Sequence, residues 1–549
     1  MRIGQRLAVI ACALLATAGR AVPEGSETAK VGEAIYLRGV LPGGTPLEGT
    51  QSRMGIHQHG ADAACVNCHQ RSGLGSHEGA SAIPPITSEY LFRPRLPRAH
   101  DGPAAIANLH RPRAAYTDVT LARAIRSGID AEGRPLNDLM PRFDLDDASI
   151  AALVAYLREL SSHRSPGVTD AALQFATVVT PDADPVARRG MLDVLERYVA
   201  ERNSAPLKPS PSSSVPGTHG SPTGMGVANR RWQLHLWALS GSPETWRSQL
   251  ERQFAAQPVF ALLSGLGTAN WGPVQGFCEQ HAVPCFFPNV EVPVDGEQDF
   301  YSVYFSEGVL LEAELIAKAI ASGDTSAGSP AVRQVYRRGD SGEAAAAVLA
   351  TALRSRNVRV TSDALQADAA ARSLNNALSR GHSAEVLVLW LRPHDLAALA
   401  HLDAPPPGRL YLSGIMSGLE NAPLPPGWRA SAALSYPFEL PQRRGVQLDY
   451  ARGWLSFNRI PVVDLRVQAD TYLACTLLSD ALKLMADHAS GAYLIEQLHG
   501  LLEHRSLTGY YPHLALATRQ HFASKGGYIV RFDAPQGTTV VADTAWTVP

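Results

Sequence analysis

Two cysteines separated by two residues and followed directly by a histidine, Cys65-Val66-Asn67-Cys68-His69, constrain this chain more than any other feature. At this spacing two thiols can form thioether bonds to the two vinyl groups of one haem, and the adjacent histidine then lies under the iron as an axial ligand. The motif occurs once. It therefore predicts one covalently attached haem c, and a segment that folds around it.

Three other interpretations of the motif are a redox-active dithiol, half of a zinc site and chance. A structural zinc site needs further thiols or a spaced histidine pair, and the next cysteine along the chain is Cys278. A thioredoxin-like dithiol belongs in a βαβ unit, and no such pattern surrounds Cys65 and Cys68. The haem interpretation is therefore favoured.

Helical patterns surround the motif. Residues 32–38 predict a short amphipathic first helix, and residues 117–127 predict another, closed by Gly128. Asp146 is placed to cap a last helix, whose apolar stripe has helical spacing: Ile150, Leu153, Val154, Leu157 and Leu160. Beside the haem motif, such a stripe is typical of the last helix of a cytochrome.

The stretch ARAIRSGIDAEGRPLNDLMPRFDLDDASIAALVAYLREL resembles the C-terminal half of class I c-type cytochromes. In that family a methionine in an M-P-x-[FY] loop supplies the second axial ligand, and the matching residue here is Met140. The resemblance implies an all-α cytochrome c domain over residues 30–163. A buried gap-filling role for Met140 is the alternative, in which case the ligand is one of Met54, His57, His59, His77, His100 and His110.

An insertion of roughly residues 90–116 lengthens the chain between His69 and Met140. It carries five arginines: Arg93, Arg95, Arg98, Arg111 and Arg113. Their planar forks suit carboxylates, including haem propionates or an acidic redox partner. The alternative is a solvated basic loop.

The N-terminus predicts export. Arg2 and Arg6 precede a short apolar run over residues 7–18, followed by small residues, so residues 1–21 have the pattern of a cleaved signal peptide. Lipidation of Cys12 within it is an alternative. No later segment reaches the length of a transmembrane helix. The formal net charge of −2 excludes a global basic field for nucleic acid. We therefore expect a periplasmic protein.

The rest of the chain alternates strands and helices, which predicts an α/β fold with parallel sheets. The expected strands are 175–179, 234–239, 259–263, 285–287, 332–336, 386–391 and 409–413. The expected helices are 186–200, 244–256, 274–280, 342–354 and, near the end, 472–487. The pattern restarts at 332, which predicts two lobes. Residues 203–227 are rich in Pro, Ser and Gly and predict a flexible loop within the first lobe.

Residues 170–549 resemble type I periplasmic solute-binding proteins, the group of the branched-chain amino acid receptors. The resemblance rests on layout and on three segments: FALLSGLGTANWGPVQGFCEQHAVPCFFP, FYSVYFSEGVLLEAELIAKAI and VYRRGDSGEAAAAVLATAL. It implies a two-lobed module that holds a small-molecule solute in a cleft, on loops after the strands. By position, the cleft candidates are Ser264, Gly265, Asn289 and Tyr304 in the first lobe, and Asp340 and Ser341 in the second; ordinary loop residues are the alternative.

Other motifs are missing or ambiguous. The chain has no G-x-G-x-x-G after a strand, no P-loop and no G-x-S-x-G elbow. Cys278 and Cys285 are seven residues apart, and an oxidising compartment permits a disulfide between them, with two small buried hydrophobes as the alternative. Cys475 lies on an expected helix and is predicted to be a buried free thiol.

These features predict a multidomain protein: an all-α class I cytochrome c domain followed by an α/β, two-lobed, periplasmic-binding-protein-like module. The leading hypothesis is electron transfer with a periplasmic redox partner, such as a dehydrogenase or a terminal acceptor, aided by a module that binds a solute or docks that partner. A second hypothesis is a solute receptor for a transporter or sensor, with the haem as a redox attachment. A third is an enzyme, disfavoured because an iron with both axial positions filled leaves no site for substrate.

Overall fold

The computed structural model describes residues 27–51, 55–78, 81–95, 112–162, 164–204, 226–268, 270–294, 296, 299–322, 330–379, 386–402, 408–517 and 519–549. The chain divides into two compact units, the first ending at Ser162. The expected signal peptide at 1–21 and most of the expected flexible loop at 203–227 lie outside the described residues. So do Met54, Arg98, His100, His110 and Arg111.

The helices of the first unit are α1 (Glu27–Arg38), α2 (Val66–His69), α3 (Ser88–Leu91), α4 (Asp118–Ser127) and α5 (Asp147–Glu159). Thr117 caps α4, which ends at Gly128 in the left-handed conformation, and Asp146 accepts a hydrogen bond from the Ser149 N–H at 2.7 Å to cap α5. Helices α1 and α5 pack closely because Gly32 has no side chain: a Cβ there would overlap the Ala152 carbonyl.

The first unit is not all-α, which corrects that part of the expected fold class. Strands β2 (Ile56–His59), β1 (Glu48–Gln51) and β5 (Arg142–Phe143) form an antiparallel sheet, and β3 (Ser76–Glu78) pairs with β4 (Ser81–Ile83). Two- to four-residue strands carry too little periodicity to be detected in sequence. Their pairing matters for the site, because β5 begins two residues after Met140.

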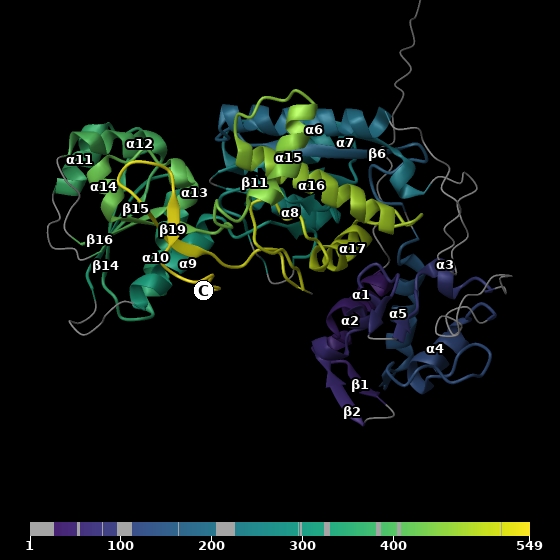
Figure 1. Ribbon diagram of the computed structural model, residues 1–549. Coiled ribbons are helices and arrows are strands. Elements are labelled where there is room, and N and C mark those ends of the chain that lie inside the picture. Colours follow the sequence, from purple (N-terminus) through teal and green to yellow (C-terminus); the bar gives the residue numbers. More distant parts are fainter. Residues whose placement is uncertain are drawn as a thin grey trace, which may run out of the picture. The chain divides into compact units, whose positions relative to one another are not determined.

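The second unit begins with an α/β lobe (Figure 1). Its parallel sheet has the order β11 (Asn289–Val290), β9 (Leu266–Gly267), β6 (Ala172–Val179), β8 (Ala261–Leu263), β10 (Cys285–Phe286) and β12 (Ser302–Val303), with β7 (Arg231–Ala238) also paired to β6. Helices α6 (Pro185–Ser204), α7 (Pro243–Ala256) and α8 (Gly272–His281) connect these strands. Every residue of β6 is buried, as expected for a central parallel strand.

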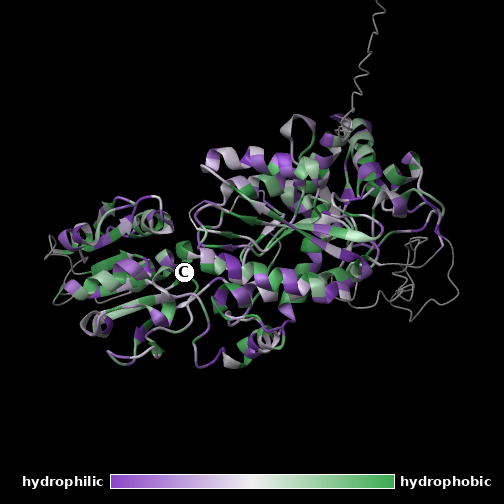
Figure 2. Ribbon diagram, turned by 90° about the horizontal axis from the view of Figure 1, so that it is seen from above, coloured by the Kyte–Doolittle hydropathy of each residue, from purple (hydrophilic) through white to green (hydrophobic). Residues whose placement is uncertain are grey.

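The second lobe has the strand order β14 (Val360–Leu365), β13 (Val332–Arg337), β15 (Val386–Trp390), β16 (Arg409–Ser413), β17 (Ala432–Tyr436), β18 (Tyr528–Phe532) and β19 (Val540–Ala542). The first five are parallel and the last two antiparallel. The helices of this lobe are α9 (Val309–Ala321), α10 (Ser341–Arg354), α11 (Ala371–Ser379), α12 (Pro393–Ala398), α13 (Gly414–Ser417) and α14 (Pro426–Ser431). Figure 2 shows the mainly hydrophobic strands of both lobes between helices of mixed hydropathy.

The chain passes between the lobes three times. It enters the second lobe before α9 and returns after β17. It then forms α15 (Gly445–Phe457), α16 (Leu465–Leu484) and α17 (Gly491–Glu503), of which α16 packs on α6, and finally crosses back to β18. The expected helix at 472–487 overlaps the later part of α16, which starts earlier, is capped by Asp464 and ends at Leu484. In the described part of the chain, no helix is both long and apolar enough to cross a membrane.

A carboxyl group is buried inside the second lobe. Glu312 on α9 has no exposed surface, and its carboxyl oxygens accept hydrogen bonds from the Ile415 N–H at 3.0 Å and from the Ser413 hydroxyl. Burial raises its pKa to about 8, against the opposing effect of these hydrogen bonds. The group therefore retains its proton at neutral pH.

This buried acid predicts a pH-dependent stability. Because the pKa of a free glutamic acid is about 4.3, the folded state keeps a proton on Glu312 that the unfolded chain releases above that pH. The contribution of this group to stability therefore falls as pH rises from about 4 to 8. The Glu312→Gln variant has no ionisable group at this position and so lacks this pH dependence. The difference in free energy of unfolding, variant minus wild type, should therefore rise by a few kcal/mol between pH 5 and pH 9. Urea unfolding followed by tryptophan fluorescence measures this, with Glu196→Gln, at an exposed position, as control. A constant difference across pH would contradict the prediction.

Candidate functional site

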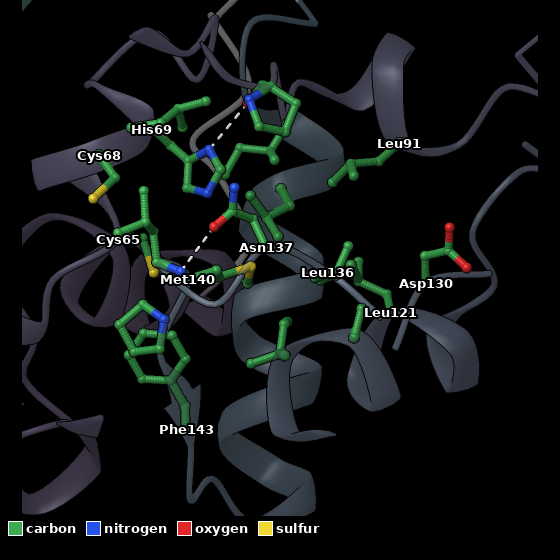
Figure 3. Close-up of a pocket in the computed structure, with 18 of the residues that line it drawn as sticks. Cys65, Cys68, His69, Leu91, Leu121, Asp130, Leu136, Asn137, Met140 and Phe143 are labelled. Carbon is green, nitrogen blue, oxygen red and sulfur yellow. Dashed lines mark hydrogen bonds between the residues drawn. The ribbon is translucent and has the colours of Figure 1, made fainter. Parts of the chain in front are cut away.

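A cavity of about 650 Å³ lies in the first unit and collects the residues of the cysteine–histidine motif. Cys65, Cys68, His69 and Met140 all line it, although Met140 is distant in sequence. Figure 3 shows the His69 imidazole and the Met140 side chain entering the cavity from different elements, above and below one another in that view. Much of the remaining wall is apolar, from residues such as Leu121, Ile125, Phe143, Leu153 and Leu157.

The orientation of His69 is set by one hydrogen bond. Its Nδ1 donates to the Pro84 carbonyl at 3.1 Å, which leaves Nε2 without a proton. Burial lowers the pKa of His69 to about 4, only partly offset by the bond to Pro84. The imidazole is therefore neutral at physiological pH, with a lone pair available for a metal. Pro84 was not singled out from the sequence, because nothing local relates it to His69.

The two thiols of the motif lie on α2 and the residue before it. Burial raises the pKa of Cys65 to about 12, which disfavours the reactive thiolate that a redox dithiol requires. Among the described residues, no group of three or more His, Cys, Asp or Glu side chains is arranged to hold a metal ion. Both observations weigh against the dithiol and zinc interpretations and favour attachment to a cofactor.

Met140 lies on an ordered loop. Its N–H donates to the Asn137 carbonyl at 3.1 Å, and Arg142 donates to the Met140 carbonyl at 2.5 Å. Pairing of β5 with β1 holds the loop against the cavity. Of the rival ligands, His57 and His59 are exposed on β2, with His59 paired to Glu48, and neither lines the cavity. The side chain of His77 lies outside the described part of the chain.

Two arginines, Arg95 and Arg113, line one part of the cavity wall. Arg113 is buried and lies 4.4 Å over the Tyr116 ring, and its described hydrogen bonds go to the backbone carbonyls of Tyr90, Leu91 and Ala114. Arg95 donates to the Tyr90 hydroxyl at 2.9 Å, and within the described residues neither arginine forms an ion pair. Burying a guanidinium without a paired anion is costly, so an anion is favoured beside the buried Arg113 and its partly exposed neighbour Arg95. The two carboxylates of a haem meet that need, and the residues present therefore fit the group. Arg93, by contrast, is exposed and paired with Glu89.

The family model described as cytochrome c matches residues 58–161, a span that contains the motif and Met140. Residues 58–161 form a cytochrome c domain. A domain of this family carries covalently bound haem c and serves haem-based electron transfer. No curated protein matches the chain.

Two first-lobe candidates of the second unit are buried rather than open to a cleft. Ser264 has no exposed surface, and Asn289 donates to its hydroxyl at 3.1 Å and to the Thr471 hydroxyl at 3.3 Å. Helix α16 thus covers these strand ends. Gly265 lies against Trp271, with a φ of 137°. Tyr304 points into the core of the lobe, where its hydroxyl donates to Gln275 at 2.5 Å.

The two second-lobe candidates lie where the lobes meet. Asp340 accepts from Arg392 at 2.6 and 3.0 Å, and the Ser341 hydroxyl donates to Glu291 at 2.6 Å. Glu291 follows the first-lobe strand β11, and Arg392 follows the second-lobe strand β15. Neither Glu291 nor Arg392 was identified from the sequence. The signal for Arg392 was its place just after strand β15, which matches the place of Asp340 after β13.

Solved structures resemble the second unit in fold. A branched-chain amino acid ABC transporter protein from Thermus thermophilus, with bound valine, has a TM-score of 0.51 at 11% identity, covering 69% of this chain and 97% of its own. A substrate-binding periplasmic protein from Ralstonia solanacearum has a TM-score of 0.49 at 12% identity, covering 68% of this chain and all of its own. The first likeness shows that the cytochrome c domain is joined to a module with the type I periplasmic-binding-protein fold.

The cysteines of this module are free thiols. Cys278 and Cys285 are both buried without a disulfide, and burial, together with the Cys285 thiol, raises the pKa of Cys278. In this structure Cys278 and Cys285 are thus small buried hydrophobic residues, the second of the two interpretations of their sequence spacing. Cys475 is likewise a buried free thiol, as predicted.

Proposed function

We propose that this protein is a periplasmic cytochrome with one haem c, which transfers electrons to or from a redox partner. Cys65 and Cys68 attach the porphyrin, and His69 and Met140 bind the iron. The observation that carries the proposal is the convergence of these four side chains on one cavity within a matched cytochrome c domain. The partner is a periplasmic dehydrogenase or a terminal acceptor, and residues 1–21 direct export as a signal peptide that is then cleaved.

The geometry favours electron transfer over catalysis at iron. When bound, the haem supplies a one-electron couple, and a thioether ligand suits the ferrous state. His69 is held by Pro84, Met140 by its loop on β5, and the apolar wall excludes water. With His69 and Met140 both holding the iron, no position on it would remain open to a substrate. Arg95 and Arg113 would neutralise the haem propionates.

For the second unit, we propose capture of a small solute between the lobes. The type I fold supports this, as do strand-end polar groups from both lobes, among them Asp340 and Ser341. Docking of the redox partner is the alternative role of this unit, and a receptor feeding a transporter or sensor is the alternative for the whole chain. A midpoint potential that shifts when a solute binds would favour the sensor.

The cofactor assignment predicts a simple stoichiometry. Mature protein from an export-competent host with cytochrome maturation should contain one haem and one iron per chain. Acid acetone should not extract that haem, because the thioethers are covalent. Pyridine haemochrome absorbance against protein concentration measures the ratio, and intact mass gives the N-terminus after export. Extractable haem, or a ratio of two, would contradict the proposal.

A further inference from the structure

The two lobes of the second unit are joined by one arginine held between two carboxylates. Arg392 donates through Nε and one terminal nitrogen to Asp340, at 3.0 and 2.6 Å, and through both terminal nitrogens to Glu291, at 2.8 and 2.6 Å. Both edges of the guanidinium are thus engaged in bidentate pairs, the strongest geometry available to arginine.

The two carboxylates have different roles. Asp340 belongs to the same lobe as Arg392, caps α10 and fixes the orientation of the guanidinium. Glu291 comes from the other lobe and reaches the outward edge, where the Ser341 hydroxyl also donates to it at 2.6 Å. The Arg392 edge and the Ser341 hydroxyl together make a receptor for a carboxylate, and Glu291 fills it.

We propose that this receptor is the solute-anchoring site of the module, that its ligand is the carboxylate of a small organic acid, and that Glu291 is an internal competitor which such a ligand displaces. The inference rests on solute binding by the second unit and identifies the chemical class of the solute.

Charge and exposure support exchange at this site. The cluster holds two carboxylates and one guanidinium, and Arg466 acts electrostatically on Glu291 from the start of α16. A solute carboxylate that replaces Glu291 keeps the same contacts to Arg392 and Ser341 and releases Glu291 towards solvent. The Glu291 and Arg392 side chains are 13% and 22% exposed, so solvent reaches the pair. In the wild type, Glu291 lowers the apparent affinity, because only the fraction of molecules with a free receptor can bind.

The test uses the full-length holoprotein, because all eight tryptophans lie in the second unit and report on it alone. Propionate and benzoate are titrated by calorimetry and by tryptophan-monitored melting, with propionamide and benzamide as uncharged matches. Glu291→Gln should bind the acids at least about ten-fold more tightly than wild type, and the amides not at all. Ser341→Ala or Arg392→Lys, added to Glu291→Gln, should reverse the gain. Glu196→Gln and Arg338→Gln, at exposed positions, should behave as wild type.

The outcomes separate this inference from the function on which it rests. If the wild type binds a solute and Glu291→Gln leaves that affinity unchanged, the inference is wrong and solute binding stands. Equal binding of acids and amides also overturns it. If neither protein responds to any acid, amide or other neutral solute, solute binding itself is contradicted, and the ion pair is a permanent link between the lobes. Far-ultraviolet circular dichroism confirms that each variant is folded.

Discussion

Replacing both Cys65 and Cys68 with alanine is expected to abolish covalent haem completely. Each thiol supplies one thioether, and no other described cysteine lines the cavity. The single variants keep one bond each and should retain part of the haem. Haem staining of denatured protein on a gel, normalised to protein, measures the loss.

Cys278→Ala is the matched control, because that thiol is buried in the second unit, outside the cytochrome c domain, and its replacement should leave haem attachment intact. Covalent haem surviving in the double variant would show that the attachment site lies elsewhere. The second unit should still unfold cooperatively in the double variant, because it has a hydrophobic core of its own.

Met140→Ala is expected to produce the largest change in redox behaviour. The oxidised wild type should show a weak far-red absorption band from a sulfur–iron bond, and the variant should lack it. Losing the thioether should also lower the midpoint potential, by on the order of 0.1 V or more, because axial ligands set haem potentials over a range of about 0.8 V. Optical redox titration measures both effects on one sample.

Three variants test three of the six rivals of Met140. His57→Ala and His59→Ala change exposed residues of β2, and Met54→Ala changes a residue outside the described part of the chain. All three should leave the band and the potential as in the wild type. If Met140→Ala instead leaves the spectrum unchanged and one of these three alters it, the axial role belongs to that residue.

Much of the fold followed from short-range patterns. Thr117 with Gly128, and Asp146 with its apolar stripe, predicted α4 and α5 to within a residue of their bounds. In the second unit, the expected strand at 409–413 is β16 as predicted, and 332–336 falls one residue short of β13. Caps and hydrophobic periodicity depend on residues three or four apart, so the sequence contains them directly.

Contacts between distant segments decided the remainder. The cysteine–histidine motif alone indicated haem attachment, but only folding placed Pro84 on His69, Arg113 in the cavity wall and β5 beneath Met140. Ser264 and Asp340 both follow strands, so the sequence made them equivalent cleft candidates. In the structure, Thr471 of helix α16 covers Ser264. Asp340 instead pairs with Arg392 and orients it. Which side chain reaches a strand end depends on the element packed over it. For Ser264 that element is α16, about two hundred residues further along the chain, and no local sequence pattern indicates which distant segment will pack there.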